Sequence, residues 1–345
     1  MSGLSMINKY LPLSGLCLIS GFFPAAAFAE PLSLNLGGFM RAYLVHNHQD
    51  QAAGSDARTF DILRDTEIHM KGKAPLEYGT TLGVTIEFTA DRETVGVDKS
   101  FISAAGPWGR ADLGVNNGVA ALLQVSAPAA DNNIDGPRQY INPVNYTLAP
   151  AIFTPLAGFD LEYAHDTSAS ADKLNYLTPV WHGFQAGISY TPDTGASAYA
   201  GHQEGTPSSR GLNGVNTDNV AGAYGSAYDV AARYETAWQD FKLSLGAGYV
   251  GVSHEQPNAT ETDLHSWNAG VNLGYQRWAL GVSYSENDNG LRTDTDTRIL
   301  VVGADYKTGP WNAGASYYNR TDENFNAGNA LDTDRYSVGA GYQYG

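Results

Sequence analysis

The sequence predicts an all-β fold, a transmembrane antiparallel up-and-down β-barrel, on the strength of three observations. From Leu32 onward, apolar side chains recur at every second position in segments separated by Gly, Asn, Asp and Pro clusters. Several segments approach the roughly 9 to 11 residues that a tilted strand needs to cross a bilayer. Aromatic residues gather at the segment ends, as they do in the two interfacial girdles of membrane barrels.

Alternation gives each predicted strand one apolar face and one polar face. Within residues 82–89 the two sets are Leu82, Val84, Ile86 and Phe88 against Gly83, Thr85, Glu87 and Thr89. A secreted β-sandwich would pack its apolar faces between two sheets, and its strands have commonly about 5 or 6 residues. Segments such as 241–252 are longer than this, which favours a barrel whose apolar face meets lipid and whose polar face meets water.

The connections between segments alternate in length, as in outer-membrane barrels. Short ones are expected at 73–80, 105–109, 179–183, 236–240, 276–278 and 307–310. Long polar ones are expected at 48–57, 116–171, 192–223, 253–263, 287–296 and 321–334. This pattern predicts about 14 strands, with the amino terminus on the side of the short turns.

The first 29 residues are typical of a secretory signal peptide. Lys9 precedes an apolar stretch that ends in Ala27-Phe28-Ala29, which predicts cleavage before Glu30 and a mature barrel over 30–345. The only cysteine, Cys17, lies in the signal, so the mature chain would hold no thiol or disulfide. The net charge of −16 argues against a nucleic-acid partner, which requires a basic surface.

Four stretches and a repeated hairpin carry a family resemblance. The stretches are Gly37-Gly38-Phe39-Met40-Arg41, Arg64-Asp65-Thr66-Glu67-Ile68, residues 108–114, and residues 176–179 with 183–192; the hairpin is residues 303–317. In these features the chain resembles the general diffusion porins of Gram-negative bacteria, of the alphaproteobacterial type. The resemblance implies a barrel of sixteen strands, a homotrimer, and a third external loop folded into the lumen. It also implies a multi-pass protein of the outer membrane, in contact with lipid and lipopolysaccharide.

The end of the chain departs from the family pattern. Family members usually finish with an aromatic residue, whereas here Gly345 follows Tyr344. Residues 338–345 also align with 302–309, after which a turn and a further strand follow in the earlier copy. The expectation is therefore that two final strands, a C-terminal hairpin, are missing from this sequence.

A diffusion channel needs no catalytic residue, only a lumen whose width and charge select solutes. The stretch 116–171 is the expected constriction loop, with the acidic residues Asp131, Asp135, Asp160 and Glu162. Alternation predicts that the pore wall carries Arg41, Glu67, His69, Lys71, Glu87, Arg110 and Asp112. Asp131 and Asp135 are expected to face Arg41, Lys71 and Arg110 across the lumen. The predicted function is passive diffusion of small hydrophilic solutes and ions, with a weak preference for cations.

Several rival motifs lead to weaker hypotheses. Residues 246–251 match a dinucleotide-binding pattern by letter, but they lie inside a predicted strand, where glycines that ease barrel curvature are the better interpretation. No metal site is predicted, because His46 and His48 lack a third ligand. The pairs Asp294 with Asp296 and Asp332 with Asp334 could bind calcium in external loops, but solvated loop carboxylates are the better interpretation.

Two other functions stay open at this point. A membrane-barrel hydrolase would pair a serine with His165, His182 or His265, but no spacing supports such a pair. A substrate-specific channel would stack sugars or oligosaccharides on aromatic residues of the lumen. The sequence does not separate this channel from a nonspecific one.

Overall fold

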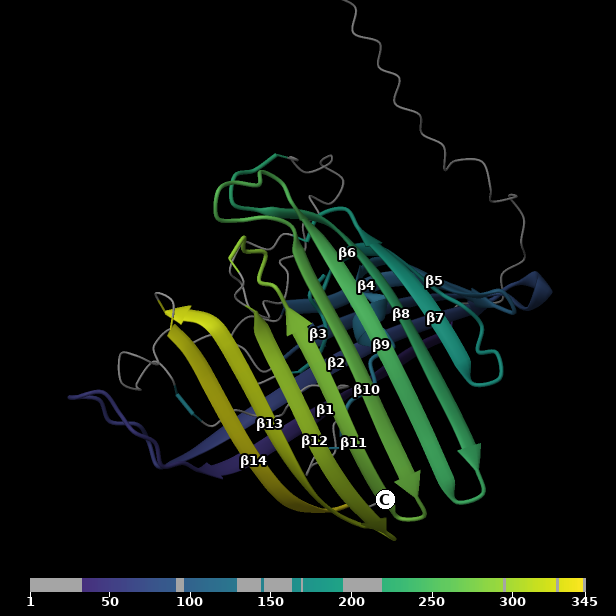
Figure 1. Ribbon diagram of the computed structural model, residues 1–345. Coiled ribbons are helices and arrows are strands. Elements are labelled where there is room, and N and C mark those ends of the chain that lie inside the picture. The colour runs from purple at the N-terminus through teal and green to yellow at the C-terminus, as the bar shows by residue number, and fades with distance from the viewer. Residues whose placement is uncertain are drawn as a thin grey trace, which may run out of the picture.

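The computed structural model describes residues 33–90, 96–128, 144–145, 163–168, 170–194, 219–293, 296–326 and 329–343. Within these ranges, 14 antiparallel strands form one sheet whose order follows the chain from first to last. The topology is therefore up-and-down, and the sheet curls so that its first strands lie behind its later ones (Figure 1). The predicted fold class and strand number are confirmed.

The elements follow one another with few interruptions. The strands are β1 (Ser33–His46), β2 (Phe60–Pro75), β3 (Thr81–Thr89), β4 (Gly96–Gly106), β5 (Gly109–Asn116), β6 (Ala171–Leu177), β7 (Phe184–Thr191), β8 (Tyr224–Trp238), β9 (Phe241–His254), β10 (Leu264–Tyr275), β11 (Trp278–Asn287), β12 (Thr297–Thr308), β13 (Trp311–Asn326) and β14 (Asn329–Tyr342). The helices are the 3₁₀ turn η1 (Glu77–Gly79) and α1 (Val119–Leu122). Neither of these helices has the length and hydropathy to cross a bilayer, and the described residues hold no other.

Tight turns join the strands at one rim of the sheet, where the sequence predicts them. Gln239 and Gln276 have positive φ angles of 53° and 55°, and Gly309 has 56° in the turn between β12 and β13. Two-residue hairpin turns require such left-handed backbone, because it matches the twist of the flanking strands. The first strand begins at this rim, as expected for the amino terminus.

One predicted long connection is wrong. Residues 321–334 are not a loop, because β13 continues to Asn326 and β14 begins at Asn329. Polar cross-strand contacts continue the ladder here: Thr321 donates to Asp332 at 2.6 Å, and Tyr317 donates to Asp334 at 2.6 Å. The polar composition of these residues predicted a loop, but hydrogen-bonded side-chain pairs stabilise a strand equally well.

The outer face of the sheet is apolar, as alternation predicts. On β1 the residues Leu34, Leu36, Met40 and Leu44 are between 62% and 77% exposed, whereas the intervening Arg41 and Tyr43 are partly buried. The later strands follow the same rule, with Ile188, Val230 and many other apolar side chains exposed on this face. Such a surface would be unfavourable in water and is typical of a lipid-facing barrel wall.

Two rows of aromatic side chains border this apolar band on the later strands. The row at the short turns includes the contacts Phe241–Tyr275, Trp278–Tyr306 and Trp311–Tyr342, with ring centroids 4.5 to 4.7 Å apart. The second row includes the contacts Tyr190–Tyr228, Trp267–Tyr284 and Tyr317–Tyr336. Trp267 and Tyr275 lie in different rows, eight residues apart on β10. That separation is roughly 26 Å along a strand and about 20 Å in height after a typical tilt, close to the apolar band of an outer-membrane barrel.

The buried core lies between the inner face of the sheet and the long connection after β5. Three apolar clusters hold this connection in place. Val119 and Leu123 contact Leu177 and Ala231, while other loop residues pack on β9 and on β12 and β13. The prediction of a long loop folded into the barrel is confirmed for residues 117–128, 163–168 and 170 of this connection.

The two edges of the sheet are not joined by hydrogen bonds in the described part of the chain. Strand β1 pairs only with β2 there, and β14 pairs only with β13. The resemblance implies sixteen strands, whereas these ranges contain 14.

Candidate functional site: the charged inner face

The inner face of β1 to β5 carries the charged residues that the sequence predicts for a pore wall. Alternation places them opposite the exposed apolar residues, because neighbouring side chains of a strand point to opposite faces. The structure brings all seven predicted residues onto this face: Arg41, Glu67, His69, Lys71, Glu87, Arg110 and Asp112. We call this region the charged wall.

Strand register determines which charges meet on the charged wall. Arg41 is the direct antiparallel partner of Asp65, and the two side chains form an ion pair. Glu87 of β3 and Lys99 of β4 are also direct antiparallel partners, and the ammonium of Lys99 lies 2.8 Å from Glu87 Oε2. On β5, Arg110 Nε donates to Asp112 Oδ1 at 2.6 Å. Lys71 Nζ lies 3.6 Å from Glu87 Oε1, so the predicted cations Arg41, Lys71 and Arg110 each lie next to a carboxylate on this face.

A bulge in β4 adds a charge that the sequence did not indicate. The β3–β4 register shifts at Glu87, so that Asp98 and Lys99 together lie opposite this one residue. Lys99 Nζ contacts Asp98 Oδ2 at 3.0 Å as well as Glu87. Alternation along 96–106 would have placed Lys99 inward, but no sequence signal indicated the bulge or the position of Asp98.

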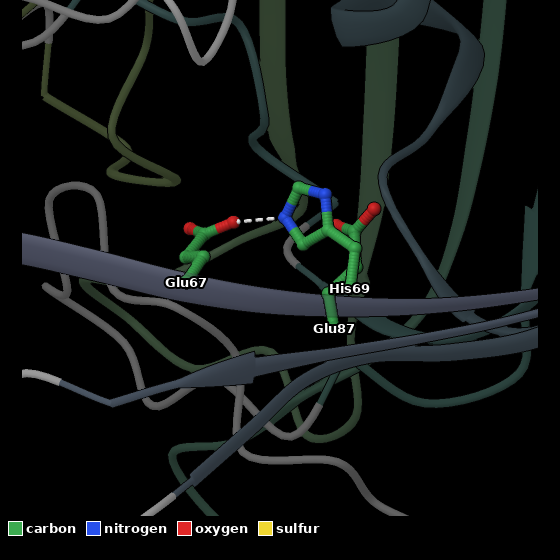
Figure 2. Close-up of side chains that lie close together, drawn as sticks. All are labelled: Glu67, His69 and Glu87. Carbon is green, nitrogen blue, oxygen red and sulfur yellow. Dashed lines mark hydrogen bonds and ion pairs between the residues drawn. The ribbon is translucent and has the colours of Figure 1, made fainter. Parts of the chain in front are cut away.

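His69 lies between two glutamates of the charged wall. Its Nε2 is 2.7 Å from Glu67 Oε2, and both residues lie on β2 with one residue between them. Glu87 of β3 is the direct partner of His69 in the register. Figure 2 shows the imidazole with one carboxylate on each side of the ring. The two Glu residues are largely buried, at 6% and 8% exposed.

Glycines on the opposite part of the inner face let the long loop approach the strands closely. A Cβ added at Gly270 would lie 1.8 Å from the carbonyl oxygen of Val125, and one at Gly303 would lie 1.8 Å from that of Pro128. Gly246 and Gly248, inside the letter match to a dinucleotide motif, also lie under loop residues. The prediction that this motif lies within a strand is confirmed. The loop contact, rather than curvature, explains why small residues are needed at these positions.

A buried polar network fastens the loop to the strands. Ser168 Oγ donates to Asp229 Oδ2 at 3.0 Å, and Lys173 Nζ lies 3.2 Å from both the Oγ and the carbonyl oxygen of Ser168. The hydroxyl of Ser189 accepts from the backbone N–H of Val119 at 2.8 Å. Sequence reasoning missed these residues. The sequence does contain a signal for them, because each polar residue alternates with apolar residues that face outward, as Asp229 does between Tyr228 and Val230.

The acidic loop residues lie outside the described ranges. These are Asp131, Asp135, Asp160 and Glu162. Of the carboxylates considered for calcium, Asp294 is also outside, and Asp296 contacts Arg298 at 3.1 Å just before β12. Asp332 and Asp334 lie in β14 rather than in a loop, so their predicted location is wrong. Calcium binding itself stays a prediction.

Comparisons with known proteins identify the same architecture. Salmonella typhi OmpF, in a complex with daunomycin, superposes with a TM-score of 0.55 at 15% identity, over 91% of this chain and 86% of that chain. A porin refined at 1.8 Å gives the same TM-score and identity over 91% of this chain and 90% of its own. At such identities the likeness shows the fold alone.

Sequence comparisons reach further. The chain is 24% identical over 241 residues to the uncharacterised protein RC0098 of Rickettsia conorii, and the match covers 57% of this chain and 54% of that protein. The chain thus spans about half the length of this curated relative. The family model described as Gram-negative porin matches residues 15–345, almost the whole chain. The chain therefore belongs to the Gram-negative porin family.

Proposed function

We propose that this protein is an outer-membrane channel for the passive diffusion of small hydrophilic solutes and ions, with a weak preference for cations. Family membership supports the general function. The separation of the two faces of the sheet supports the mechanism, because the apolar outer band suits lipid and the charged wall requires water. No catalytic step is needed.

The charged wall is the observation that carries this proposal. Lys71 and Arg110 are 48% and 44% exposed on the inner face, although they lie near carboxylates. Such exposed charged side chains require an aqueous space beside them, since burial of a charge in an apolar medium costs on the order of several kcal/mol per ion. A solute moving along such a wall meets alternating charges that replace part of its hydration.

The preference for cations is proposed to arise from acidic residues of the long loop. Residues 117–128 and 163–168 of this loop rest on the inner face, and Asp131, Asp135, Asp160 and Glu162 lie in the sequence between them. An excess of carboxylates near a constriction raises the local concentration of cations. The wall cations Arg41, Lys71 and Arg110 would complete a transverse field.

Planar-bilayer recordings test the proposal. The purified protein should insert as open channels, and a KCl gradient should give a reversal potential that favours cations. The double variant Asp131→Asn with Asp135→Asn should move this potential toward zero. Glu77→Gln with Asp240→Asn removes the same charge from the short-turn rim and serves as the control. If both double variants kept the wild-type potential, the loop carboxylates would not form the selectivity element.

We also propose the assembly and location that the family resemblance implies. The chain would lose residues 1–29, insert into the outer membrane in contact with lipid and lipopolysaccharide, and form a homotrimer. Mass spectrometry of the protein isolated from outer membranes should find Glu30 at the amino terminus. Chemical cross-linking in the same membranes should give a ladder that stops at three copies. A single band at the mass of one copy, with no cross-linked species, would rule out the trimer.

A substrate-specific channel is the second candidate, because aromatic rings lie beside cations on the charged wall. Arg41 lies over the ring of Phe39 at 4.8 Å, and Arg110 lies 5.8 Å from the ring of Phe101. Sugars stack on accessible aromatic rings, and of these two rings Phe39 is partly exposed whereas Phe101 is buried. Millimolar oligosaccharide should then block the current of a specific channel in a saturable way, whereas a diffusion channel should show only a small drop that is proportional to concentration.

A membrane-barrel hydrolase has less support. Ser168 and Lys173 lie close enough to suggest a nucleophile and a base, but their side chains are almost fully buried under the loop. The three histidines considered for catalysis lie apart, with His165 in the loop, His182 in a turn and His265 bonded to Tyr249 on β9. Lipid hydrolysis by the purified protein in the absence of conductance would overturn the channel proposal.

A further inference from the structure

We propose that Glu67, His69 and Glu87 form a binding site for a divalent transition-metal cation, with Zn²⁺ as the reference ion. The sheet itself builds the site. Glu67 and His69 point to the same face because they are two residues apart on β2, and Glu87 is the register partner of His69 on β3. One ligand atom from each residue can be chosen so that all three lie within 4.8 Å of one another.

The donor atoms select the class of metal. One imidazole nitrogen and two carboxylate oxygens suit Zn²⁺, Ni²⁺ or Cu²⁺, whereas Ca²⁺ and Mg²⁺ prefer sites made of oxygen alone. Three protein ligands on one side of the ion leave the remaining position for water or a solute. Metal–ligand bonds of about 2.0 to 2.1 Å require the donor atoms to lie about 3.3 Å apart. The most widely separated donor atoms, up to 4.8 Å apart, must therefore approach each other by up to roughly 1.5 Å, which rotation of the flexible glutamate side chains allows.

The surroundings of the site set the strength of binding. Lys99 Nζ holds Glu87 Oε2 at 2.8 Å, and Lys71 Nζ lies 3.6 Å from Oε1 of the same carboxylate. A metal must compete with these ammonium groups, so its binding should be moderate and reversible. Lys99 also contacts Asp98 at 3.0 Å, so Asp98 remains as its counter-ion when Glu87 binds the metal.

Without any metal, the same cluster forms a ladder of ion pairs that could serve only to stabilise the sheet. The structural role and the metal-binding role predict different effects of Lys99→Met on zinc affinity. If the cluster only stabilises the sheet, Lys99→Met lowers the stability of the sheet and confers no metal affinity. If the cluster is a metal site, Lys99→Met removes the competitor of the ion at Glu87 and raises the affinity for Zn²⁺. The change in zinc affinity on this substitution therefore separates a metal-binding role from a structural one.

Calorimetric titration of the detergent-solubilised protein with ZnCl₂ tests the proposal. Wild type should bind one Zn²⁺ per chain. His69→Asn should bind this ion at least about tenfold more weakly, as expected for loss of a ligand. His182→Asn removes an imidazole from a turn where asparagine suits the positive φ of 48°, and it should bind like wild type. Lys99→Met should bind several-fold more tightly. Equal isotherms for wild type and His69→Asn would overturn the site.

Two further readouts distinguish failure of the metal site from misfolding of a variant and from failure of the proposed channel function. X-ray absorption at the zinc edge should show a mixed nitrogen and oxygen shell in wild type, and its absence would contradict the site even if a variant misfolds. Zn²⁺ should also reduce single-channel current in wild type and leave His69→Asn unaffected, whereas Ca²⁺ should reduce neither. Zinc binding without any effect on current would support the metal site and contradict the proposed position of the charged wall in an open lumen.

Discussion

Substitution of Gly270 by alanine should push the long loop away from the strands. A Cβ at this position would lie 1.8 Å from the carbonyl oxygen of Val125, whereas ordinary contact begins at 3.4 Å. The loop or the strand must therefore move by about 1.6 Å. Overpacking of this kind costs about 1 to 3 kcal/mol. The smaller entropy of the unfolded chain offsets about 0.4 to 1 kcal/mol of that cost, so we expect a net loss of roughly 1 to 2 kcal/mol.

Gly37 supplies the matched control for this substitution. A Cβ there would meet no atom within 4 Å, so Gly37→Ala should leave the free energy of unfolding within about 0.5 kcal/mol of wild type. Guanidinium unfolding in lipid vesicles, followed by tryptophan fluorescence, measures both variants under the same conditions. The displaced loop should also change single-channel conductance in Gly270→Ala alone. Equal stability and conductance of the two variants would refute the close contact between loop and strand.

Two other substitutions test the loop anchor and the lipid-facing band. Lys173→Met removes the ammonium from the buried network around Ser168 and Asp229 and should cost about 3 to 5 kcal/mol, because it leaves a buried carboxylate uncompensated. Adding Asp229→Asn should restore much of that loss in the same unfolding assay, and additive losses would contradict the coupling. Leu245→Arg, midway between the aromatic rows on the outer face of β9, should cost about 2 to 4 kcal/mol, whereas Thr236→Arg near the rim should cost at most about 1 kcal/mol. Similar losses for the two arginine variants in a folding titration would show that the band does not lie in the bilayer core.

Much of the fold was predictable because a strand has a side-chain period of two. Leu34 and Leu36 were expected on one face and Arg41 on the other, and the structure has them there. Gaps in this alternation marked the short turns correctly. The prediction failed at residues 321–334, where polar side chains bond to each other across two strands, as Thr321 does with Asp332. Polarity alone does not distinguish a solvated loop from a polar hairpin.

The candidate site was predictable in its composition but not in its pairing. The sequence placed Glu67, Lys71 and Glu87 on the polar face, yet it did not indicate which cation each carboxylate meets. Lys99 contacts Glu87 because the two residues are partners in the β3–β4 register, and the bulge that follows brings Asp98 beside them. Neither strand alone specifies this register, which depends on how the two strands pair. The glycines of β9 were assigned to curvature, since nothing in a single strand shows that a loop will pack on it.

By itself, the sequence determined the fold class, the number of strands in the described ranges, the face of the sheet that each regularly alternating segment presents to either side, and the rim that holds the short turns. These properties depend on local backbone geometry and on the contrast between apolar and polar residues. Only the tertiary structure decided that His69 lies between Glu67 and Glu87, and that Val125 and Pro128 rest on glycines of distant strands. The physical reason is that Glu87 and the loop residues come from other elements of the chain, and their positions follow from sheet register and loop packing, which form only when the whole chain folds.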